Sequence, residues 1–231
     1  MCTPRSPCLF ASIALTLQLA IPSALQGQVT ARDGHDHRLF ECTDDGLSRT
    51  GSTGFGCQQL AKYDLPHFSD APLFWHLAKL PSGATAKTTK GQATFVVDAA
   101  GQNWLFSIGP EDAAPKQGQH VATVGPLPLT VAKSYAVVAY FVVMPVGAYT
   151  MVHTHPGPEA WYVLEGAQCL DTPGGALRVA AGQTGVAPPD TPMRLHNSGS
   201  VTRRALFIVI HDAAQRWGSP SDWKPSRACD R

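Results

Sequence analysis

The sequence predicts a mainly β protein, a β-barrel or jelly roll preceded by a small α+β unit. Nineteen prolines and 21 glycines among 231 residues indicate many turns between short elements. Short apolar runs recur at roughly even spacing from residue 121 onward, as they do in barrels and jelly rolls. Hydrophobic residues make up 44% of the chain and charged residues 15%, which is sufficient for a buried core.

Residues 1–27 have the layout of a secretory signal peptide. Arg5 precedes the apolar run 9–21, which is too short to span a bilayer, and small or helix-breaking residues follow it. We expect cleavage between Ala24 and Thr30, which would release a secreted or periplasmic protein without a membrane segment. The alternative is an N-terminal anchor that is not cleaved.

Residues 28–120 form the N-terminal part of the mature chain. Its first portion, up to residue 70, is polar and rich in turns. The next portion predicts a strand over 71–80 and a short helix over 82–91, with Ser82 as its cap and Gly91 at its end. Two apolar runs, 95–97 and 104–108, then predict a hairpin around a turn at 99–103. The small α+β unit is this strand, helix and hairpin, and it offers an alternative role as a partner-binding face.

Residues 121–215 predict the barrel, and residues 216–231 a C-terminal tail. The longest apolar runs are 134–144 and 205–211, and the second is apolar almost throughout, as expected for a strand buried on both faces. Between them the pattern predicts short strands at 150–155, 159–164, 168–171, 177–180, 185–187 and 193–197.

Removal of the leader leaves four cysteines, Cys42, Cys57, Cys169 and Cys229. An even number in an exported chain fits disulfides. Cys42 with Cys57 is the preferred pair, because the stretch between them is short and flexible. Cys169 would then pair with Cys229 and fix the C-terminal tail to the domain. The other connectivities, and buried free thiols, remain alternatives.

His153, His155 and Glu159 form the strongest functional pattern. Residues two apart on a strand face the same side, so the two imidazoles point together. Residues 156–158 then turn the chain, and Glu159 begins the returning strand beside them. Two imidazoles and one carboxylate are a facial ligand set that leaves positions open for water, substrate or oxygen.

The spacing around these residues resembles the cupin superfamily. Gly147, His153, His155, Glu159 and Gly166 stand at the intervals of the first cupin motif. The second motif matches at Gly182, Pro188 and Asn197, but Asp190 replaces its glycine and Met193 its histidine. The resemblance covers about residues 128–213.

The resemblance implies a single small cupin-type barrel with inward-facing metal ligands. It assigns His153, His155 and Glu159 as ligands of a divalent ion, which would be Fe, Mn, Ni, Zn or Cu. Cupins are often dimers, so the resemblance also implies a homodimer and a small-molecule ligand. We do not expect the protein to bind nucleic acid, because its net charge is only +1 and its sequence contains no basic cluster.

Met193 leaves three alternatives for the fourth ligand position, since a thioether is a soft and weak donor. In the first alternative, water or substrate occupies the fourth ligand position. A variant of it has copper as the metal and Met193 as a long axial ligand. His196 would replace the imidazole, although it lies three residues on and faces the other side of a regular strand unless a bulge intervenes. In the third alternative, the pocket binds metal weakly or not at all, and Met193 simply lines the barrel.

The sequence therefore predicts an exported cupin protein with a metal and a small polar ligand at it. Trp161 and Val163 share the face of Glu159 by parity, and with His196 they are candidates for the pocket lining. An enzyme with this site would be a metal-dependent oxygenase, decarboxylase or isomerase. The alternative is a non-catalytic binding or sensing module with a degraded metal site.

Overall fold

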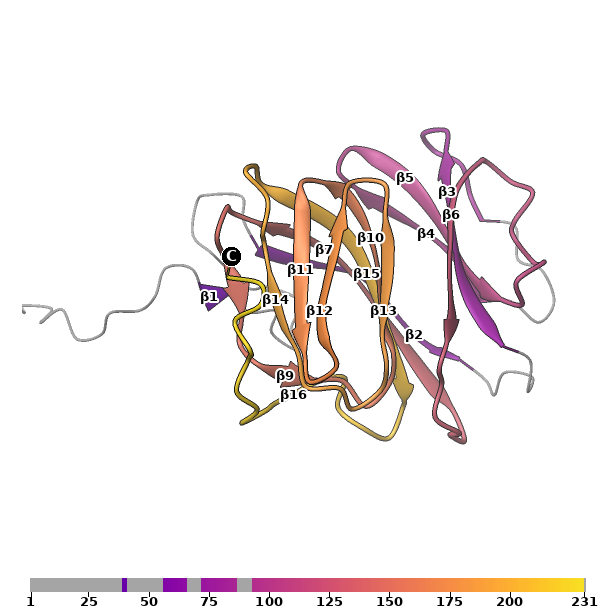
Figure 1. Cartoon of the computed structure of the whole chain (residues 1–231). Coiled ribbons are helices and arrows are strands. Elements are labelled where there is room, and N and C mark those ends of the chain that lie inside the picture. The colour runs from indigo at the N-terminus through magenta and orange to yellow at the C-terminus, as the bar shows by residue number, and fades with distance from the viewer. Residues whose placement is uncertain (1–38, 41–55, 66–71, 87–92, 231) are drawn as a thin grey trace, which may run out of the picture. The chain divides into compact units, whose positions relative to one another are not determined.

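The computed structural model describes residues 39–40, 56–65, 72–86 and 93–230. Every regular element in these ranges is a β-strand (Figure 1), which confirms the predicted mainly β class. Within the same ranges no helix has the length and hydrophobicity needed to span a bilayer. The proposed leader, residues 1–27, lies outside the described residues.

Two five-stranded sheets form the jelly roll. Sheet A has the order β1 (Leu39–Phe40), β8 (Tyr149–Thr150), β14 (Arg194–His196), β11 (Ala167–Thr172) and β12 (Gly175–Ala180). Sheet B has the order β13 (Thr184–Ala187), β10 (Glu159–Glu165), β15 (Arg203–Asp212), β7 (Tyr135–Met144) and β2 (Gly56–Leu65). A short pair, β9 (His153–Thr154) with β16 (Ser219–Pro220), joins the C-terminal tail to the segment that precedes β10.

A separate four-stranded sheet contains the N-terminal unit. Its order is β4 (Ala93–Ala99), β5 (Gln102–Gly109), β3 (Leu73–Leu80) and β6 (Gln119–Leu127). The predicted strand and hairpin are both present, and the hairpin turns through Ala100 and Gly101, with φ of 54° and 70°. Two successive positive φ values match the twist of a tight hairpin.

The predicted helix over 82–91 is not found in its described part. Residues 82 and 83 form a turn, residues 84–86 have no regular structure, and residues 87–91 lie outside the described residues. Gly83 has φ of 75°, which suits a turn directly after β3. The polar residues that suggested a helix cap therefore belong to a turn, because capping and turn signals use the same residue types.

Sheet B is buried on both faces. One face carries Val137, Leu206 and Ile208, which pack with Trp75 and Phe106 of the four-stranded sheet. The other face carries Val138, Tyr140 and Phe207, which pack with Leu170 and Leu195 of sheet A. Burial on both faces explains why β7 and β15 are nearly continuous apolar runs.

Strand pairing crosses residue 120 in the described part of the chain. β2 comes from the N-terminal segment but pairs with β7 in sheet B, and β6 pairs with β3 in the four-stranded sheet. Hydrophobic periodicity does not predict such pairings, because strands that pair across a long stretch of sequence leave no local pattern.

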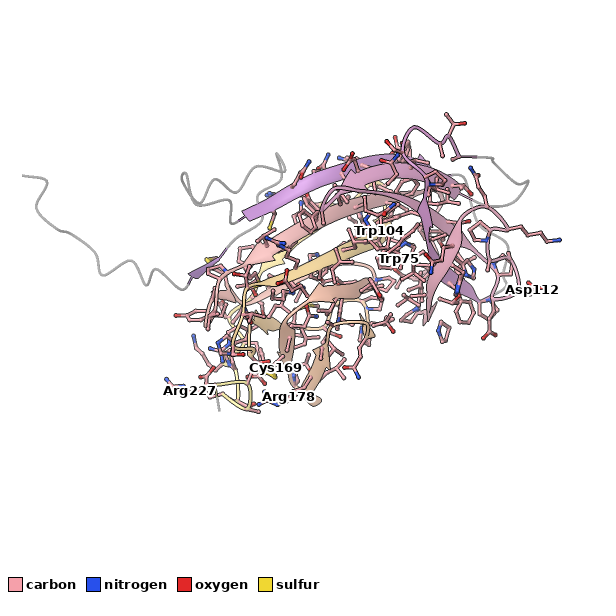
Figure 2. The ribbon with its side chains drawn as sticks, turned by 90° about the horizontal axis from the view of Figure 1, so that it is seen from above. Trp75, Trp104, Asp112, Cys169, Arg178 and Arg227 are labelled. Atoms are coloured by element: carbon pink, nitrogen blue, oxygen red, sulfur yellow. A yellow bond between two sulfur atoms is a disulfide. The ribbon has the colours of Figure 1, made fainter. Side chains whose placement is uncertain are left out.

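The C-terminal tail is fixed to sheet A. A disulfide joins Cys169 to Cys229, as predicted, with 5.5 Å between their Cα atoms. Arg178 donates a hydrogen bond to the carbonyl of Ala228 at 2.7 Å, and Figure 2 shows Cys169, Arg178 and Arg227 at this edge. Cys57 is also disulfide-bonded, whereas Cys42, its predicted partner, lies outside the described residues.

Candidate metal centre

Three ligand-type side chains converge where the chain turns between β9 and β10. One ligand atom each from His153, His155 and Glu159 lies within 4.8 Å of the others. The two imidazole rings are 4.9 Å apart at an interplanar angle of 74°, and Nε2 of His155 lies 3.7 Å from Oε2 of Glu159. The structure thus brings together the three residues predicted as ligands.

Backbone carbonyls orient both imidazoles. Nδ1 of His153 donates to the carbonyl of Met151 at 2.8 Å, and Nδ1 of His155 donates to the carbonyl of Trp217 at 2.6 Å. Because the acceptors are carbonyls, each Nδ1 carries the proton in these hydrogen bonds and each Nε2 keeps its lone pair. Outer partners of this kind hold metal-binding histidines in position, so both rings present the nitrogen that a cation needs.

Burial shapes the electrostatics of the centre. It raises the pKa of Glu159 to about 7, and the nearby Arg203 guanidinium opposes this rise. It lowers the pKa of His155 to about 3, with the neighbouring His153 acting in the same direction, and it lowers the pKa of His153 as well. Two neutral imidazoles beside a poorly solvated carboxylate fit a bound cation, which would compensate the buried negative charge.

Gly157 allows the close turn between the ligands. A Cβ atom at this position would lie 1.7 Å from the carbonyl oxygen of Ile210 and 2.9 Å from Cα of His211. Both contacts are with backbone atoms of β15, which cannot move aside as the end of a flexible side chain can. The turn therefore requires glycine for its packing against β15, and this packing places Glu159 beside the imidazoles.

We predict that Gly157→Ala lowers the free energy of unfolding by about 2 kcal/mol or more, because β15 and the turn must separate. Denaturant unfolding of the purified variant measures this loss. Gly174→Ala is the matched control, since its added Cβ would meet only Oγ1 of Thr172, at 3.6 Å. Equal stability of the two variants would contradict the packing argument.

The C-terminal tail forms one wall of the site. The Trp217 ring stacks on His155 with 5.1 Å between centroids and an interplanar angle of 21°. A Cβ at Gly218 would lie 3.1 Å from Nδ1 of His155, so the backbone of the tail passes close over the ring. The sequence of residues 216–231 predicts only a tail, with no part in the site. The Trp217–Gly218 pair could have indicated a packed segment, but its position in the sequence does not show which part of the fold it contacts.

A cavity of about 400 Å³ opens beside the three ligands. Its walls are mostly apolar, with Tyr140, Val142, Leu195, Phe207, Val209 and Trp217 among the lining residues. Among the described lining residues, the three ligands are the only histidines or acidic residues, and Arg216 is the only Lys or Arg. A ligand in this cavity would meet the metal at one end and apolar side chains around its body.

Met193 lies next to His153 but belongs to the apolar core. The two residues form an antiparallel bridge, with hydrogen bonds of 3.1 and 2.9 Å between their backbones. Directly paired residues face the same side, so Met193 also faces the interior. Its side chain is fully buried in the cluster with Trp161 and Leu195, and it does not line the cavity.

His196 is outside the cavity, so it does not serve as the predicted lining residue. Its Nδ1 bonds to the carbonyl of Cys229 at 2.8 Å, and its ring meets Tyr149 edge-on. Among the described residues the ligand cluster comprises His153, His155 and Glu159 without it. The parity argument against His196 agrees with this placement.

Trp161 and Val163 are also absent from the cavity lining. Both are fully buried in the core between sheets A and B, on the face that parity predicted. The Trp161 ring lies against β13, where a Cβ at Gly185 would come within 2.4 Å of it. Trp161 and Val163 fill the barrel beside the site. Parity predicts which face of a strand a side chain is on, but it does not predict how far along that face a cavity extends.

Arg203 is a buried cation that sequence analysis did not single out. Its guanidinium lies 4.5 Å from the Phe207 ring centroid and donates a hydrogen bond to Oε1 of Gln168. Burial lowers its pKa to about 9, and Glu159 opposes this change. The only signal in the sequence was a charged residue shortly before an apolar strand.

The metal-free protein is expected to lose stability as the pH falls below 6.5. Burial lowers the pKa of His76, His153, His155 and His211 from 6.5, so the unfolded chain binds more protons than the folded chain below that pH. Each histidine that stays neutral contributes a slope of up to about 1.4 kcal/mol per pH unit.

Glu159 acts in the opposite direction, because its raised pKa stabilises the fold at low pH and this contribution is lost as the pH rises through about 7. Four histidines outweigh this single carboxyl. Denaturant unfolding between pH 5 and pH 7 measures the balance, and greater stability at pH 5 than at pH 7 would contradict it.

Comparison with known proteins agrees with this architecture. The family described as "Cupin domain" matches residues 140–209. Uncharacterized protein MJ1618 of Methanocaldococcus jannaschii is 34% identical over 65 residues, which cover 28% of this chain and 52% of that protein. The chain thus spans about half the length of this curated relative.

Two bacterial proteins are among the solved structures to which part of the chain is similar. A conserved protein with a double-stranded β-helix domain from Klebsiella pneumoniae is 21% identical, over 38% of this chain and 76% of that one, with a TM-score of 0.34. A cupin-like protein from Thermotoga maritima is 22% identical, over 40% and 67%, also with a TM-score of 0.34. The family match and the motif from Gly147 to Gly166 identify residues 140–209 of this chain as a cupin domain.

Proposed function

We propose that this protein is an exported cupin that binds one divalent metal ion and takes a small ligand at that metal. Nε2 of His153, Nε2 of His155 and the carboxylate of Glu159 would hold the ion. The observation that carries the proposal is their convergence within 4.8 Å at the wall of a 400 Å³ cavity.

The donor set suits a borderline divalent ion such as Fe, Mn, Ni, Zn or Cu, since imidazole and carboxylate together accept all of them. Three protein ligands leave positions free for solvent or a ligand. The placement of Met193 in the apolar core supports this arrangement over a fourth ligand from the protein.

The cavity favours a ligand with a polar head and an apolar body. An oxygen donor, such as a carboxylate or hydroxyl, would reach the metal, while Val142, Phe207 and Val209 would contact the rest. The closely packed tail, with Trp217 against His155, shields this side of the centre from solvent.

When bound, the metal would supply Lewis acidity or a site for oxygen chemistry. The chain's own residues position the ligand and limit its access to water. The described lining contains no histidine or acidic residue beyond the three ligands, so no separate imidazole or carboxylate is available there as a general base. This observation favours the alternative, in which the protein binds or senses its ligand without turnover.

Elemental analysis of the purified mature chain tests the metal proposal. We expect about one divalent ion per chain, and we expect its loss in His153→Ala. His120→Ala is the control, because His120 is exposed on β6 and lies outside the ligand cluster. Substoichiometric metal that His153→Ala leaves unchanged would overturn the proposal. N-terminal sequencing of chain recovered after export tests the leader separately.

A further inference from the structure

Two cavities are neighbours on the inner face of sheet B. The first is the cavity of about 400 Å³ beside the metal ligands, and the second has a volume of about 270 Å³. Val209 lines the first cavity, and His211, two residues further along β15, lines the second. Alternate residues of a strand share a face, so these two side chains project from one surface at positions about 7 Å apart.

The side chain of Trp217 stands between the two cavities. Among the described lining residues, Arg216 and Trp217 are the only two that the cavities share. The indole packs against two rings of the first cavity, with 5.1 Å between centroids to His155 and to Tyr140. Arg216 is exposed, whereas the indole is held between these rings. The indole is therefore the packed part of the wall that ends the first cavity.

The space beyond this wall differs in chemistry from the space at the metal. Lys62, Asp64, His211 and Gln215 bring polar groups to the second cavity, whereas the walls of the first are mostly apolar. Nδ1 of His211 donates to the carbonyl of Asp212 at 2.8 Å, so its Nε2 is an acceptor. This buried Nε2 has no hydrogen-bond partner among the described residues, and solvent in the second cavity would supply a donor.

We propose that Trp217 determines the length of the ligand that the metal centre accepts. The site would select molecules with a carboxylate or hydroxyl head at the metal and a short apolar body that ends at the indole. Longer homologues are excluded, because their far ends would overlap the indole. This inference rests on the proposed function, since it requires a ligand whose head lies at the metal. Without the indole the two cavities would join, and a longer molecule would extend to His211.

Calorimetric titration of the Zn²⁺-loaded full-length chain with straight-chain carboxylates, from butanoate to dodecanoate, tests this proposal. In the parent chain the affinity should rise up to about fourfold for each added CH₂ until the probe reaches Trp217, and then fall. In Trp217→Ala the maximum should move to a longer probe. All the probes have the same head, so comparing them within one variant cancels any change in affinity at the metal itself.

The ω-hydroxy forms of the same acids report on the second cavity. In Trp217→Ala the hydroxyl of a long probe would donate to Nε2 of His211, so this probe should bind about tenfold more tightly than the plain acid of equal length. It should also shift the Nε2 resonance of His211 in nitrogen NMR. In the parent chain neither effect is expected, because the indole keeps the hydroxyl from His211.

Trp223→Ala is the matched control, because Trp223 is another tryptophan of the tail and lines neither cavity. It should leave the chain-length profile of the parent unchanged. Trp217→Leu keeps an apolar side chain at the wall and should move the maximum in the same direction as Trp217→Ala, which covers the case in which the alanine variant does not fold.

An unchanged chain-length profile in the Trp217 variants would overturn this inference and leave the proposed function in place. Binding of long and short probes to the parent without a maximum would also overturn it. If no probe binds to the Zn²⁺-loaded parent, the inference fails, and elemental analysis decides the metal proposal separately.

Discussion

Replacing His155 with alanine is expected to lower the affinity for a divalent metal more than a hundredfold. Loss of an outer partner of a metal ligand typically costs ten- to hundredfold in affinity, and loss of a direct ligand should cost more. His155 also links the ligand set to the tail, through its bond to the Trp217 carbonyl and its stacked ring. Competition titration of Zn²⁺ against a chelator of known affinity measures the change.

His196→Ala is the most informative comparison for that experiment. His196 is the imidazole that the sequence offers as an alternative ligand, but its ring nitrogen bonds to the carbonyl of Cys229 away from the cavity. We expect its substitution to change the metal affinity less than threefold. Comparable losses in the two variants would show that the centre uses a different set of ligands.

Removal of the Cys169–Cys229 disulfide is expected to lower the free energy of unfolding by about 4 kcal/mol, the chain-entropy value for a loop of this length. The bridge spans 60 positions of sequence. Metal affinity should also fall about tenfold, because the tail that holds His155 would be less firmly positioned. Denaturant unfolding and chelator competition on the Cys169→Ala/Cys229→Ala double variant measure the two effects.

Ser226→Ala provides a graded control for the double variant. Oγ of Ser226 donates to Oδ1 of the fully buried Asp171 at 2.7 Å, so its removal loosens the same tail at one contact. A loss of about 1.5–3 kcal/mol is expected, as for one hydrogen bond to a charged group. If the double variant were no less stable than Ser226→Ala, the disulfide would not be the main attachment of the tail.

The strands were predictable where burial on both faces leaves continuous apolar runs. β7 and β15 were recognised in this way, and the β4–β5 hairpin was recognised from two apolar runs on either side of a turn. The predicted helix differed because Ser82 and Gly83 serve a turn, and local sequence does not separate that use from a cap. The assignment of β2 to sheet B depends on pairing with β7, far along the chain.

The site was predictable to the extent that it is local. His153, His155 and Glu159 lie within seven residues, so strand parity and one turn suffice to bring them together. Trp217 and Arg203 reach the centre through the docking of distant segments, which leaves no pattern in spacing. Parity also gave the correct face for Trp161 but not its position beside the cavity.

We propose that three protein groups hold the metal and that Met193 does not. X-ray absorption at the metal edge of the Zn²⁺-loaded chain tests it most directly, because imidazole, oxygen and sulfur ligands are distinguishable. We predict two imidazoles, with the remaining ligands oxygen from Glu159 and from solvent or a bound molecule. A sulfur ligand or a third imidazole would contradict the account.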